Sequence, residues 1–70
     1  MNAERDPAER IRTLLLRGDS VMKSAHPERL GRALEAFEQA EQLAAGESVD
    51  PRVRELVSRR IAAVRGLIEG

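Results

Sequence analysis

The chain has 70 residues and no cysteine, and its twelve basic side chains balance its twelve acidic ones. This length allows one small domain, which buries only about 60% of its unfolded surface and is therefore marginally stable. Without disulfides or thiolate metal sites, stability must come from helix packing, self-association or a bound partner. The charge balance argues against a general attraction to nucleic acid or to an anionic membrane.

Three of the first six residues are charged, and the segment lacks the apolar core of a signal peptide. The longest apolar runs, such as Leu14–Leu16, are far shorter than the ~20 residues that span a membrane. We therefore expect a charged N-terminal tail over 1–6, a single domain over 7–70, a cytoplasmic location and no membrane contact.

Three prolines mark the starts of three helical patterns. Pro7, Pro27 and Pro51 each precede apolar residues at helical spacing, and proline is favoured at the first position of a helix, where its missing N–H group costs nothing. The prolines predict helices over 7–24, 27–45 and 51–68. No segment alternates with period two, so strands are not expected. Because the connections are short, the fold class is all-α, a three-helix antiparallel array: a helical hairpin plus a third packing helix.

The residues next to the prolines are the expected helix caps. Asp6 and Asp50 are strong N-cap candidates for the first and third helices. His26 is a weaker candidate for the second helix, and Ser24 is the alternative. Gly46 is expected to end the second helix.

Phe37 is the only aromatic residue, and it lies between Ala33 and Ala40 on one helix face. This small–large–small pattern is typical of two closely packed helices. Gly18 lies inside the first helical pattern, where glycine costs about 1 kcal/mol relative to alanine, so a packing reason is expected. We predict that these four residues define the fold.

The same residues resemble a tetratricopeptide repeat, whose pattern has a glycine in the first helix and A-x3-F in the second. Gly18 occupies the glycine position, Ala33 and Phe37 match the A-x3-F motif, and Ala40 fills the next small position. The resemblance covers roughly residues 8–51 and implies a helical hairpin that recognises proteins, with the third helix as a capping helix. The connection over 24–32 is longer than the turn of the family.

A single repeat cannot bury both of its faces, and about three repeats normally stack together. The resemblance therefore implies that this chain dimerises, docks on a partner, or belongs to a longer array.

No residue pattern indicates chemistry. His26 is the only histidine, the serines lack a nucleophile motif, and the glycines are scattered rather than forming a phosphate loop. We expect no enzyme activity, no cofactor and no metal. The arginines of the third helix spread around it without an aromatic stacking residue, so nucleic-acid binding is not expected either.

Charge differs between the helices, because the second is mainly acidic and the third mainly basic. This difference favours their pairing and fixes their register more than it adds stability. On a helical wheel, Arg60 lies near the middle of the apolar stripe of the third helix. One interpretation is that the Arg60 stem covers the core while its head reaches water or a glutamate such as Glu41. The other is that this face meets another subunit or a partner.

We therefore predict a non-catalytic protein–protein interaction module that binds a partner protein or itself through apolar helix faces, with arginine and glutamate setting the register. The alternative is a structural homo-oligomerisation domain, an obligate helical dimer without a separate ligand. Leu43 lies off its stripe and is expected to be exposed, as is Leu16. The predicted partner-binding residues are Arg60, Leu56, Leu67, Leu16 and Arg59.

Overall fold

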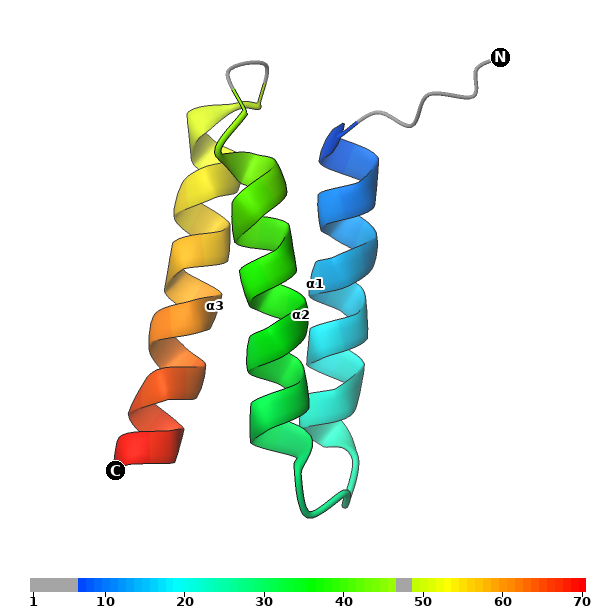
Figure 1. Cartoon of the computed structure of the whole chain (residues 1–70), viewed down its shortest axis with the longest axis vertical. Helices are drawn as coiled ribbons and strands as arrows, with labels where there is room; N and C mark the ends of the chain where they lie inside the picture. The colour runs from blue at the N-terminus through cyan, green and yellow to red at the C-terminus, as the bar shows by residue number, and fades with distance from the viewer. Residues whose placement is uncertain (1–6, 47–48) are drawn as a thin grey trace.

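A computed structural model describes residues 7–46 and 49–70. Within these residues it contains three α-helices: α1 (Pro7–Lys23), α2 (Arg29–Ala44) and α3 (Pro51–Glu69). The helices lie side by side and alternate in direction, with α2 in the middle (Figure 1). The helix α2 packs against both neighbours, whereas α1 and α3 touch each other only marginally. The predicted all-α, three-helix antiparallel array is confirmed.

The prolines at the starts of α1 and α3 mark the first helical residues, as predicted. Asp50 caps α3, because its Oδ1 accepts a hydrogen bond from the backbone N–H of Arg52 at 2.9 Å. The expected cap of α1, Asp6, lies outside the described residues. These two helices end within one residue of their predicted limits, at Lys23 and Glu69.

The predicted start of α2 at Pro27 is wrong, because the helix begins at Arg29. The preceding residues form a turn in which His26 Nδ1 accepts the backbone N–H of Glu28 at 3.0 Å. The carbonyl of His26 accepts the backbone N–H of Arg29 at 3.1 Å. His26 therefore has a turn role, and Ser24 supports it by accepting the His26 backbone N–H at 3.3 Å. Pro27 lies inside this turn.

The end of α2 also differs from the expected glycine cap. The helix ends at Ala44, with Ala45 as its C-cap. Gly46 donates its backbone N–H to the carbonyl of Leu43 at 3.3 Å, but no described glycine has a positive φ. The chain thus leaves α2 through a right-handed turn that does not require glycine.

The core is built around Phe37, which is 1% exposed. Its ring lies against Gly18 of α1, where an added Cβ atom would be 2.7 Å from Phe37 Cζ and 2.9 Å from Cδ1. Ala33 and Ala40, one turn on either side, are fully buried. Small residues therefore let α1 and α2 approach until the ring fills the space between them. The other buried hydrophobic residues are Ile11, Leu15, Ala36, Ala44, Val49, Val57, Ile61 and Val64.

One ion pair joins the acidic second helix to the basic third helix. Arg65 of α3 lies 3.2 Å from Glu38 of α2, and both side chains are about half exposed. Such a pair contributes roughly 0–1 kcal/mol, so it aligns the two helices more than it stabilises them. No described helix combines the length and the apolar character that crossing a membrane requires.

Candidate interaction site

The helices α1 and α3 run parallel, because each is antiparallel to α2, and a groove separates them. This α1–α3 groove has a volume of about 280 Å³. Its walls come from α1 and α3, and the buried Phe37 of α2 contributes to its lining. The other lining residues are Asp19, Met22, Lys23, Arg60, Ala63 and Val64.

Arg60 bridges this groove. Its Nη2 donates a hydrogen bond to Asp19 Oδ2 at 2.9 Å, and about one third of each side chain is exposed. The partner predicted from the sequence, Glu41, is wrong: Asp19 of α1 binds the guanidinium instead. The Nε atom of Arg60 is buried and has no hydrogen-bond partner among the described residues. Arg60 is thus half-buried in the groove lining beside Val64 and Phe37, and its hydrogen bonding within the described residues is incomplete.

The apolar stripe of α3 is wider than the surface that α2 covers. Val57 and Val64 are buried, whereas Leu56 is 40% exposed and Leu67 is 59% exposed. At 100° per residue, Leu56 and Leu67 share a face with Arg60 and flank it along the helix. This exposed stripe continues the α3 wall of the groove toward solvent.

Leu16, on the opposite helix, is 58% exposed. The pair Asp19–Arg60 fixes an offset of 41 residues between the parallel helices α1 and α3. The same offset places Leu16 at the height of Val57 along the helix axes. Leu16 does not line the groove, because it lies 60° around α1 from Asp19, on the side away from the core.

Two other predictions have different outcomes. Arg59 pairs with Glu55 on the exposed surface at 3.0 Å and does not line the groove, so the structure does not bring Arg59 into the groove with Arg60. Leu43 was expected to be exposed, but it is half-buried and packs against the core. Ile68, which was not among the predicted site residues, is 49% exposed near the end of α3.

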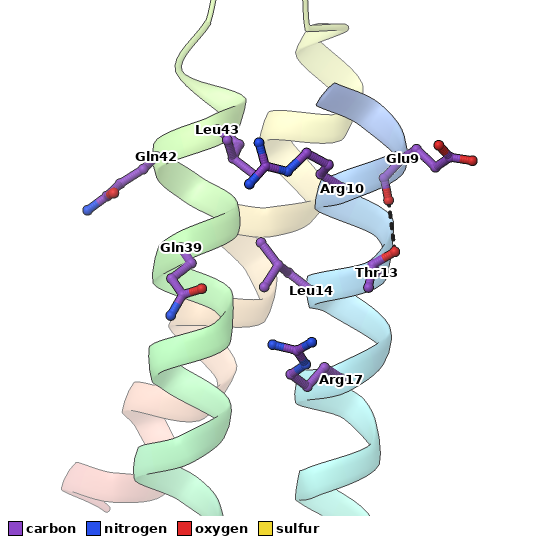
Figure 2. A pocket seen from close by; sticks show the side chains of 8 residues that line it. All are labelled: Glu9, Arg10, Thr13, Leu14, Arg17, Gln39, Gln42 and Leu43. Atoms are coloured by element: carbon purple, nitrogen blue, oxygen red, sulfur yellow. Dashed lines mark hydrogen bonds between the residues drawn. The ribbon is translucent and has the colours of Figure 1, made fainter. Parts of the chain in front are cut away.

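A second groove lies between α1 and α2, on the other side of α1. This α1–α2 groove has a volume of about 640 Å³. Figure 2 shows Arg10, Leu14 and Arg17 extending from α1 toward α2. Sequence reasoning missed it, although the spacing of seven residues between the two arginines places them on one helix face. The remaining lining residues are Glu9, Thr13, Gln39, Gln42 and Leu43.

The α1–α2 groove is positively charged. Neither Arg10 nor Arg17 forms an ion pair with a described residue. Glu9 is the only acidic residue in the lining, and its carboxylate points away from the groove (Figure 2). The Thr13 hydroxyl donates a hydrogen bond to the Glu9 backbone carbonyl of the same helix at 3.1 Å. Its proton is therefore not available to a ligand in the groove.

The described residues contain no cluster of three or more histidine, cysteine, aspartate or glutamate side chains arranged to hold a metal ion. His26, the only histidine, uses Nδ1 in the turn before α2. No protein-family model, no curated protein and no solved structure matches this chain.

Proposed function

We propose that this chain is a non-catalytic protein–protein interaction module whose α1–α3 groove binds an apolar helix of a partner protein or of a second copy. The observation that carries this proposal is the position of Leu56 and Leu67, which are substantially exposed and lie on either side of the groove residue Arg60 along α3, while Leu16 is exposed on α1. A single exposed leucine is ordinary in a soluble protein. Two exposed leucines on one helix face, beside a groove that Val64 and Ala63 help to line, form an apolar surface of the kind that marks an interaction site.

The energetics favour coverage of this surface. Burying a leucine side chain fully yields about 1.5–3 kcal/mol relative to leaving it in water. In a helix-in-groove complex, the apolar face of an incoming helix would cover Leu56 and Leu67. The same contact would fill the groove beside the buried Val64 and Phe37.

Charged residues in the groove would set the register of the partner helix. Asp19, Lys23 and Arg60 line the groove together with the apolar residues. Charge complementarity across an interface mainly discriminates between partners and orientations, and adds less to affinity. A partner helix with a carboxylate beside Lys23 and apolar side chains over the leucines fits this pattern.

The resemblance to a tetratricopeptide repeat supports the same proposal. The contact between Gly18 and Phe37 supports reading α1 and α2 as the repeat hairpin, with α3 as its capping helix. A lone hairpin with a cap leaves an incomplete core, which a second protein surface would complete.

The alternative is an obligate homodimer in which the same surfaces of two copies meet. The marginal contact between α1 and α3 favours this alternative, because a dimer would cover the open side of both copies. Light scattering over a range of concentrations separates the alternatives. A monomer that melts cooperatively at every concentration would exclude the obligate dimer.

The groove itself is tested with Leu67→Asp, and Ala62→Asp is the matched control. Both positions are exposed on α3, but Ala62 lies 140° away from Leu67 around the helix. Leu67→Asp should weaken self-association, or the binding of a synthetic amphipathic leucine-rich helix, by at least about tenfold. Ala62→Asp should leave both unchanged. If the wild-type chain neither self-associates nor binds this helix, or if the two variants behave alike, the proposal is wrong.

A further inference from the structure

We infer that the α1–α2 groove is a second binding site, for an extended acidic peptide segment whose carboxylates pair with Arg10 and Arg17. This site lies on the other side of α1 from the α1–α3 groove, so it is independent of the function proposed above. The inference depends on three features of the groove: two cations that form no ion pair with a described residue, an apolar residue between them, and an amide on the opposite wall.

Arg10 and Arg17 line the groove, but neither guanidinium group forms an ion pair with a described residue. Arg59, Arg60 and Arg65 each pair with a carboxylate, whereas Arg10 and Arg17 pair with none of the described residues. Both extend toward α2 across the groove rather than along α1 (Figure 2). Guanidinium groups bind carboxylates well because their planar donors match the two oxygens.

The spacing of the arginines indicates a peptide rather than a single anion. Residues seven apart on a helix are separated by about 10 Å along its axis. An isolated phosphate or carboxylate cannot reach both guanidinium groups unless the side chains fold toward each other. In an extended polyproline-like segment, residues three apart lie on the same side and about 9 Å apart. Two acidic side chains at that spacing would meet both arginines.

The groove also offers contacts to the rest of such a segment. Leu14 lies between the two arginines and is half-buried, with its exposed part facing the groove. An apolar side chain between the two acids would cover it. Gln39, on the α2 wall, has a side-chain amide that can both donate to and accept from a peptide backbone. The preferred segment is therefore acidic, with an apolar residue between its acids.

The experiment measures fluorescence anisotropy of a fluorescein-labelled peptide, Glu-Pro-Leu-Glu-Pro-Leu-Glu, with the full chain. The same peptide with glutamine in place of glutamate is the ligand control. The test variant is Arg10→Gln with Arg17→Gln. The matched control is Arg12→Gln with Arg54→Gln, which changes the net charge equally at two exposed arginines outside the groove that form no ion pair with the described residues.

The expected result is that Arg10→Gln with Arg17→Gln weakens binding of the acidic peptide by about tenfold or more, whereas the matched control retains wild-type affinity. The glutamine peptide should bind weakly to every protein, and wild-type affinity for the acidic peptide should fall as salt is added. Equal loss in the two double variants would show general charge attraction and overturn the inference. Equal binding of both peptides, or displacement of the acidic peptide by inorganic phosphate at matched ionic strength, would also overturn it. Leu67→Asp should leave this binding unchanged, which separates the two sites.

Discussion

At the scale of single residues, the contact between Gly18 and Phe37 makes a prediction that runs against helix propensity. Alanine normally stabilises a helix by about 1 kcal/mol relative to glycine. At Gly18, however, the added Cβ would overlap the buried Phe37 ring, and such overpacking typically costs about 1–3 kcal/mol. Gly18→Ala should therefore lower the free energy of unfolding, as measured by urea denaturation.

Gly66 provides the matched control, because it lies in α3 and an added Cβ there meets nothing within 4 Å. Gly66→Ala should raise the free energy of unfolding by up to about 1 kcal/mol. If Gly18→Ala is as stabilising as Gly66→Ala, the close packing of α1 against α2 at Phe37 is not present in solution.

Arg60 is a residue whose ion pair contributes little to stability. Its bond to Asp19 is only partly shielded from water, which limits its contribution to roughly 0–1 kcal/mol. Its buried Nε has no partner among the described residues, and an unsatisfied buried donor typically costs about 1–3 kcal/mol. Arg60→Met keeps the apolar stem and removes both effects. We expect equal or greater stability in urea denaturation.

The same variant separates two roles of Arg60. Unchanged association together with this stability would assign Arg60 a structural role, whereas reduced association would place it in the interface. A loss of more than about 2 kcal/mol of stability would contradict the expectation and show that the pair with Asp19 dominates.

The sequence pattern predicted the helix face on which Arg60 lies, but it did not predict which residue of another helix Arg60 contacts. The wheel placed Arg60 on the apolar side of α3, and the structure agrees. It did not identify Asp19, because that contact depends on how α1 aligns with α3. Two helices separated by a third carry no sequence signal of their relative register.

At the scale of helices, the N-cap of α3 makes stability depend on pH. The hydrogen bond from the Arg52 backbone N–H to Asp50 is the main cause that lowers the pKa of Asp50 below its ordinary value of 3.8. A carboxyl group with a lowered pKa in the folded state stabilises the fold above 3.8, and this contribution is lost as the pH falls through the lowered pKa.

Asp50→Asn isolates this effect, because asparagine caps helices about as well as aspartate but does not titrate. The melting temperature of the wild type should fall relative to that of Asp50→Asn as the pH drops below 3.8. Thermal melts followed by circular dichroism at neutral and acidic pH measure this difference. A difference that stays constant with pH would show that the charge of Asp50 does not strengthen the cap.

The helix ends show where proline and glycine do not predict the start or the end of a helix. Pro51 begins α3 because Asp50 caps the helix there. Pro27 does not begin α2, because the hydrogen bonds of His26 form a turn first. Gly46 similarly follows α2 without adopting the left-handed conformation that favours glycine. A sequence signal of this kind is reliable only where no competing local hydrogen bond exists.

At the scale of the whole molecule, the candidate sites were predictable in part. The exposed apolar side of α3 followed from the width of its stripe, and Leu56 and Leu67 lie there. The groove itself did not follow, because it forms only where α1 and α3 stand apart on either side of α2. The α1–α2 groove was missed for the same reason, since Arg10 and Arg17 become a pair only when α2 supplies the opposite wall.

The central position of α2 also affects how the chain folds. Each helix packs mainly on the helix next to it in the chain, so only short loops must close before the main contacts form. Helical domains with such local contacts typically fold in microseconds to milliseconds. Because α1 and α3 hardly touch, detaching α3 would break mainly its contacts with α2 and leave α1 and α2 paired. Such local opening would make the Phe37 side of the core accessible without complete unfolding.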